Sequence, residues 1–117
     1  MESWLDRYRA QVECLPPLED PWFIPALKAA RTGQSAAAKH ILGSSLSSVL
    51  NIVIRRWNEE TGIEFIDLLQ DTNKAMEDAL PKFSGSSSTE YIQYLEMTVE
   101  EAINRIVYQK RCRDSGG

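Results

Sequence analysis

The chain has 117 residues, enough for one domain with a hydrophobic core and too few for two. Hydrophobic residues make up 43% of it and charged residues 26%, as in an ordinary soluble globular protein. Its formal charge of −4 argues against broad, charge-driven binding of nucleic acid.

The sequence shows no clear targeting signal and no cysteine pattern typical of a metal site or a disulfide framework. The apolar runs are interrupted every few residues, so we expect no segment to span a membrane. The first residues lack the basic region and apolar stretch of a secretory signal. Cys14 and Cys112 are distant in sequence and have no neighbouring metal-ligand types. This pattern predicts two reduced thiols in a cytoplasmic protein.

The N-terminal third predicts two short helices. An amphipathic helix should run over residues 3–13 and end before Pro16-Pro17, because proline cannot donate a helix hydrogen bond. A second helix should begin with Asp20 as its cap and Pro21 at its first position, and end near Gly33.

The middle of the chain predicts two longer helices. The third, over residues 35–60 with Ser35 as its cap, has apolar residues at helical spacing. Its small, polar segment 43–48 should let another helix approach closely, within the chain or in a second copy. After the break at Thr61-Gly62, the fourth helix should cover residues 64–80. Its predicted inward stripe contains Ile66, Leu69, Asn73, Met76 and Leu80.

The C-terminal part predicts a flexible Ser/Gly connection and one further helix. Residues 84–88 are of low complexity, and Ser88 or Thr89 should cap a helix that runs to about Arg111. The tail, residues 114–117, should fray. The predicted fold is therefore all-α. A compact bundle of about five helices should form a single domain over 1–117, with 1–33 as an N-terminal helix pair and 34–113 as core helices.

Residues arranged for catalysis are missing from the sequence. His40 is the only histidine and has no metal-ligand partners nearby, and no nucleophile elbow or glycine-rich phosphate loop is present. Glu59-Glu60 and Glu100-Glu101 read as charge pairs on solvated faces. We therefore expect a protein that is not an enzyme and holds no metal or cofactor.

The fourth helix has an unusual polar side. It presents Asp67, Gln70, Asp71 and Lys74, with Asn73 at its edge. Asp and Asn are mediocre helix formers, so several of them in mid-helix suggest a purpose other than helicity. Taken alone, such a face is more often simply solvated.

Several segments from residue 54 onward follow one another in a distinctive order. They are Ile54-Arg55-Arg56-Trp57, Thr61-Gly62, Asp67-Leu68-Leu69-Gln70-Asp71-Thr72-Asn73, Pro81-Lys82-Phe83, the Ser-rich loop, Tyr91-Ile92-Gln93-Tyr94-Leu95 and Glu100-Glu101-Ala102-Ile103. This order resembles region 2 of the sigma-70 family of bacterial RNA polymerase specificity subunits. Residues 4–33 are loosely similar to the preceding helix pair of that family.

The resemblance implies a docking surface for RNA polymerase. In the family, the corresponding helix docks on the coiled-coil clamp of the largest polymerase subunit. Carried over to this chain, the polymerase-binding residues would be Asp67, Leu68, Leu69, Gln70, Asp71 and Asn73. Short carboxylates and amides on a helix can bond partner arginines with little loss of side-chain entropy.

The resemblance is weaker on the side that would read promoter DNA. The family's last helix recognises the −10 element through aromatic and basic residues. Here Tyr91 and Tyr94 occupy aromatic positions, which can equally belong to the core, and Arg105 supplies one basic group. Between Glu90 and Arg105 there are four glutamates and one arginine, a face that repels phosphate.

Two functions remain open at this point, besides that of a purely structural helical bundle. The first is a sigma-factor-like transcription protein that binds core RNA polymerase and reads the promoter −10 DNA weakly or unusually. The second is a sigma mimic, a regulatory module that binds an anti-sigma factor or another protein without binding DNA.

Overall fold

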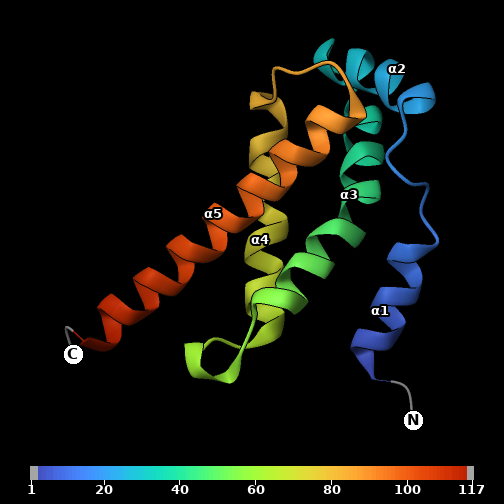
Figure 1. Ribbon diagram of the computed structural model, residues 1–117. Coiled ribbons are helices and arrows are strands. Elements are labelled where there is room, and N and C mark those ends of the chain that lie inside the picture. The colour runs from blue at the N-terminus through green and yellow to red at the C-terminus, as the bar shows by residue number, and fades with distance from the viewer. Residues whose placement is uncertain (1–2, 116–117) are drawn as a thin grey trace.

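The computed structural model describes residues 3–115, the last of them by its backbone alone, and within this range the chain contains helices and no strands. Figure 1 shows the arrangement, in which α3 and α4 stand side by side and α5 crosses them. The predicted all-α bundle of about five helices is confirmed. Its elements are α1 (Trp4–Glu13), α2 (Asp20–Arg31), α3 (Ser35–Arg56), η1 (Glu59–Thr61), α4 (Phe65–Ala79), η2 (Leu80–Lys82) and α5 (Ser88–Ser115).

The helix α3 packs against each of the other four α-helices, α1, α2, α4 and α5. Its buried side chains are Ile41, Ser44, Ser45, Val49, Leu50, Ile52 and Val53. The small segment 43–48 therefore packs within the chain, with Ser45 only 1% exposed. By length and composition alone, α3 is long and apolar enough to cross a membrane, the one such helix in residues 3–115, and the core helix of a soluble protein can meet the same criteria. In this structure its apolar side chains form the centre of the bundle.

The helix boundaries follow local signals, with several shifts in the capping residues. Ser3, expected within the first helix, is instead the N-cap of α1, and its side chain accepts a hydrogen bond from the backbone N–H of Asp6. By contrast, α3 begins after Gln34 instead of being capped by Ser35. It also ends at Arg56, earlier than expected, because the extended backbone of Trp57 turns the chain and its indole N–H bonds the Ile63 carbonyl at 2.8 Å.

The predicted cap of α2 acts on another helix. Asp20 is the first residue of α2, whose N-cap is Glu19. The Asp20 carboxylate instead accepts a hydrogen bond of 2.7 Å from the backbone N–H of Ser88, at the start of α5. This bond is the main reason that the pKa of Asp20 lies below its ordinary value. The side chain of Ser87, one residue before the predicted caps, accepts from the backbone N–H of Glu90.

The Ser-rich segment, residues 84–88, was predicted to be a flexible connection, but two side chains of α2 form hydrogen bonds with the backbone at its two ends. Beside the Asp20–Ser88 bond, the Arg31 guanidinium donates to the carbonyls of Phe83 and Gly85 at 2.9 and 2.7 Å. A Cβ on Gly85 would lie 2.5 Å from the Phe83 ring, so only glycine fits there. The last helix, α5, extends to Ser115, beyond its predicted end near Arg111; residues 116 and 117 of the predicted tail lie outside the described range.

Candidate functional site

The helix with the unusual polar side, α4, divides sharply into a buried and an exposed half. The exposed half carries Asp67, Gln70, Asp71 and Lys74, which we call the polar face of α4. On the opposite half, the side chains packed into the core are Leu68, Leu69, Thr72 and Met76. Because the core fixes the helix on one side, the polar face is presented on a well-supported backbone.

Two of the residues expected to contact polymerase lie in the core. Leu68 is fully buried and Leu69 is 3% exposed, so neither can touch a partner in this structure. Ile66, predicted to face inward, is 42% exposed. The reason is the helical spacing: Leu68, Thr72 and Met76 recur every four residues and define the buried stripe, and Ile66 lies off it. The candidate docking groups are therefore reduced to polar ones.

Asn73 joins α4 to α1 and is not freely available to a partner. It is half-buried, and its amide nitrogen donates a weak hydrogen bond of 3.4 Å to the Tyr8 hydroxyl. Its amide oxygen is buried and has no hydrogen-bond partner among the described residues. Asn73 thus marks the edge where the polar face meets α1.

The other edge of the polar face meets the C-terminal turns of α5. Asp67 and Asp71 line a hollow of about 330 Å³ together with Lys110 and Arg113. No ion pair joins these carboxylates to these cations in the described range, and Lys110 instead pairs with Asp114 at 3.3 Å. Both carboxylates therefore keep their acceptor capacity for a partner, although cations stand beside them.

Lys74 is the one cation on the polar face, and it is engaged on its own helix. Its ammonium pairs with Asp78, one turn further on, at 3.2 Å. The hydrogen bond that Lys74 donates to the Asp78 carboxylate, followed by the charges of Asp78 and Glu77, raises the pKa of Lys74. The exposed side of α4 is consequently acidic in balance.

One of the three residues expected to contact DNA is inaccessible. Tyr91 is fully buried, and its hydroxyl lies 2.8 Å from that of Ser45. Its ring packs between Phe23 and Phe83, with centroids 5.1 and 5.3 Å away. Burial raises the pKa of Tyr91 to about 12. A DNA contact by Tyr91 is therefore excluded in this conformation, and the position belongs to the core.

The other two residues expected to contact DNA, Tyr94 and Arg105, are more exposed to solvent. Tyr94 is half-buried and donates its hydroxyl hydrogen to the Ala79 carbonyl at 2.8 Å, which ties α5 to the end of α4. Arg105 is exposed. A single exposed arginine and a half-buried tyrosine make a poor platform for stacking bases and holding phosphates.

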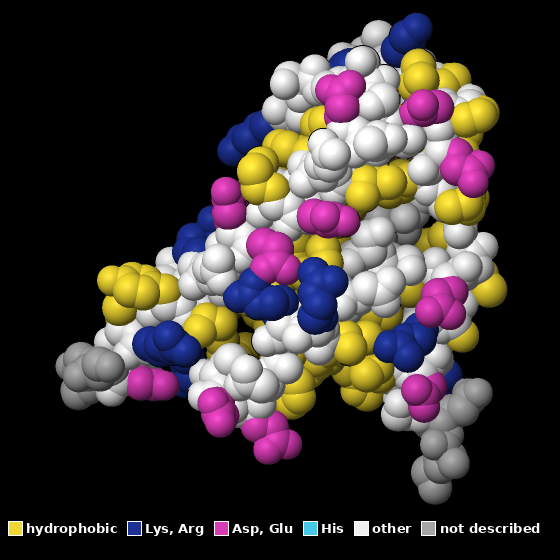
Figure 2. Space-filling model, viewed as in Figure 1, with side chains coloured by type: hydrophobic (Ala, Val, Ile, Leu, Met, Phe, Trp, Pro, Cys, Tyr) yellow, Lys and Arg dark blue, Asp and Glu magenta, His cyan; other side chains and the backbone are white. Residues whose placement is uncertain are grey.

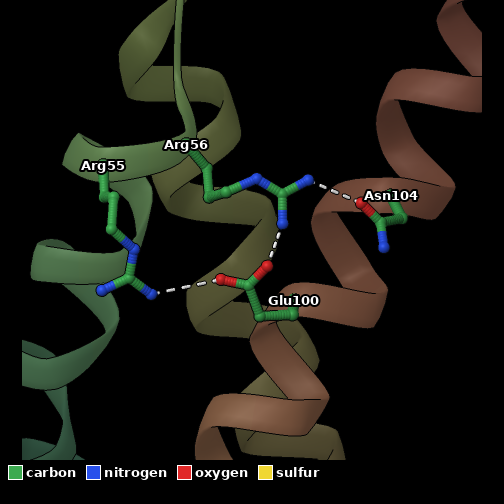
Figure 3. A network of polar contacts seen from close by, with 4 residues as sticks. All are labelled: Arg55, Arg56, Glu100 and Asn104. Carbon is green, nitrogen blue, oxygen red and sulfur yellow. Dashed lines mark hydrogen bonds and ion pairs between the residues drawn. The ribbon is translucent and has the colours of Figure 1, made fainter.

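Glu100 was expected on a solvated face but joins α5 to α3 (Figure 3). Its carboxylate accepts hydrogen bonds from Arg55, at 3.3 Å, and from Arg56. The Arg56 guanidinium also donates to the Asn104 side-chain oxygen at 2.6 Å. Both arginines of the segment Ile54-Arg55-Arg56-Trp57 are thus engaged by side chains of α5. Figure 2 shows the consequence on this face, where cationic and anionic side chains alternate and no continuous basic surface forms.

The side chains of metal-ligand type are scattered over residues 3–115. No three His, Cys, Asp or Glu side chains gather there in a group that could hold a metal ion. Cys14 and Cys112 are both free and exposed. The ring of His40 lies edge-on to that of Trp22, at 4.7 Å between centroids.

Comparison with known proteins adds no relative to these observations. No protein-family model matches the chain, and no curated protein matches its sequence significantly.

Proposed function

We propose that this chain is a sigma-factor-like transcription protein that binds core RNA polymerase in the cytoplasm through the polar face of α4. The resemblance described above names the coiled-coil clamp of the largest subunit as the docking partner. The groups assigned to the contact are Asp67, Gln70 and Asp71. Recognition of promoter −10 DNA is weakened or altered in this proposal.

One observation carries the proposal: the three polar groups of the motif that can reach a partner stand together on one side of a helix. Asp67, Gln70 and Asp71 are all exposed, while the other side of α4 is core. A short carboxylate on a fixed helix loses little side-chain entropy when it receives an arginine from a partner. The apolar positions of the same motif explain why the helix is fixed.

The weakened DNA recognition is supported by the state of α5 and its neighbours. Tyr91 is held in the core, and Arg55 and Arg56 are engaged by Glu100. The exposed surface of the first half of α5 remains acidic in balance, which disfavours phosphate. Polymerase docking without strong DNA contact is the combination these residues favour.

A pull-down with core RNA polymerase tests the docking. The parent chain should bind, and Asp71→Arg should abolish binding because it places a cation against the partner's arginines. Glu101→Arg makes the same charge change at an exposed position of α5 and should bind as the parent does. Absence of binding by the parent chain would contradict the proposal.

A fluorescence assay with single-stranded −10 promoter DNA tests the second half. We expect no sequence-selective binding at physiological salt. Selective binding would show that DNA recognition is retained. If neither polymerase nor DNA is bound, the alternative of a sigma mimic that serves an anti-sigma factor or another regulator takes precedence.

A further inference from the structure

Exposed apolar side chains gather at one edge of the polar face of α4. In the described residues, five large apolar side chains are exposed: Trp4, Leu15, Ile66, Met97 and Tyr108. Single exposed apolar residues are normal on a protein surface. Two of these five, Trp4 at 44% and Ile66 at 42%, come from α1 and α4, whose side chains make contact through Trp4 with Phe65 and Tyr8 with Asn73.

Two side-chain contacts between α1 and α4 show that Trp4 lies near the start of α4, the part of the helix that carries Ile66. The Trp4 ring lies 6.2 Å from that of Phe65, the residue before Ile66. One turn along α1, Tyr8 contacts Asn73, which shares the side of α4 that carries Ile66 because seven residues make two helical turns. Figure 1 shows the first turn of α1 and the first turns of α4 at the same end of the molecule.

Charge determines what can cover this surface. From Glu64 to Asp78 there are five carboxylates and one lysine, so the surface favours a cationic partner. On the α5 side of the polar face, Lys110 and Arg113 would repel such a partner. On the α1 side, the apolar pair Trp4 and Ile66 offers a contact without that repulsion.

We propose that Trp4 and Ile66 form the apolar anchor of the surface whose polar part is Asp67, Gln70 and Asp71. Its occupant is a cationic helical segment with an apolar side chain that seats against Trp4. This inference rests on the proposed function, since the occupant is the docking segment of core RNA polymerase. It adds α1 to an interface that the sequence motif confines to α4. Buried tryptophans at the centre of an interface typically carry a large share of the binding energy.

The experiment measures the affinity of core RNA polymerase for matched alanine variants. Trp4→Ala and Ile66→Ala should each weaken binding about tenfold or more, as expected for interface anchors. Met97→Ala and Tyr108→Ala remove exposed apolar side chains elsewhere, on α5, and should bind as the parent does. Circular dichroism melting of each variant separates loss of an anchor from loss of folding, and Ile66→Ala keeps the test valid if Trp4→Ala unfolds.

The outcomes distinguish the two proposals. Parent-like binding by Trp4→Ala and Ile66→Ala, together with loss of binding by Asp71→Arg, would overturn the anchor and leave polymerase docking intact. Equal weakening by the α5 controls would also overturn the anchor. A parent chain that does not bind polymerase would overturn both.

Discussion

Ser45 in α3 and Tyr91 in α5 share a hydrogen bond of 2.8 Å between their hydroxyl oxygens, in the core of the bundle. The Ser45 hydroxyl has one hydrogen, which it donates to the Ile41 carbonyl at 2.7 Å. Tyr91 must therefore be the donor to Ser45. Ser45, a small polar residue in the middle of α3, thus accepts the hydrogen bond of Tyr91, the one buried tyrosine of α5.

Ser45→Ala should destabilise the protein more than Tyr91→Phe. The first change leaves the Tyr91 hydroxyl buried without a partner, at a cost of about 1–3 kcal/mol. The second removes that hydroxyl and leaves Ser45 its bond to Ile41, at a cost of about 1 kcal/mol. Urea denaturation of both variants measures the difference. A larger loss for Tyr91→Phe would contradict the direction of donation.

Stability should fall in alkaline solution through the same tyrosine. The unfolded chain releases the Tyr91 proton near its ordinary pKa of 10.0, and the folded chain holds it until about 12. The contribution is therefore complete below pH 10 and is lost as the pH rises toward 12, by about 2–3 kcal/mol at the upper end. The difference in the free energy of unfolding between the parent and Tyr91→Phe, measured at each pH, separates the contribution of Tyr91 from that of other titrating groups. Parallel pH profiles for the two proteins would refute the assignment.

The bond between Asp20 and Ser88 should protect the start of α5. Asp20→Ala removes the acceptor, so the amide hydrogen of Ser88 should exchange with solvent faster than in the parent. Because the folded pKa of Asp20 is lowered, the same protection is present above its ordinary value of 3.8 and is lost as the pH falls below it. Glu19→Ala is the matched control, since the Glu19 side chain makes no capping bond. Equal exchange in the two variants would contradict this role.

Glu100 should contribute more to stability than its neighbour Glu101. Glu100→Ala removes the acceptor shared by Arg55 and Arg56, at a cost of about 1 kcal/mol that shrinks in high salt. Glu101 is exposed and makes no ion pair in the described range, so Glu101→Ala should be close to neutral. Thermal unfolding at low and high salt measures both effects. Similar melting temperatures for the two variants would show that the arginine contacts add little.

The amino-acid sequence by itself determined the helical elements and most of their ends. The capping pattern at Ser3, the prolines at 16, 17 and 81, and the turn at Gly62 act through neighbouring backbone groups, so their effect can be predicted locally. The left-handed backbone of Gly62, with φ of 71°, is one such signal. The polar face of α4 also followed from helical spacing alone.

The tertiary structure decided which side chains meet and which remain accessible. Asp20 was predicted to cap its own helix, but its partner is Ser88, 68 residues away. Tyr91 could have faced solvent or core, and Ser45 on another helix supplies the acceptor that makes its burial possible. Likewise, Asn73 is half-buried because Tyr8 of α1 lies against it. Helix propensity and caps act within a few residues, whereas these outcomes depend on how helices cross, which no short segment encodes.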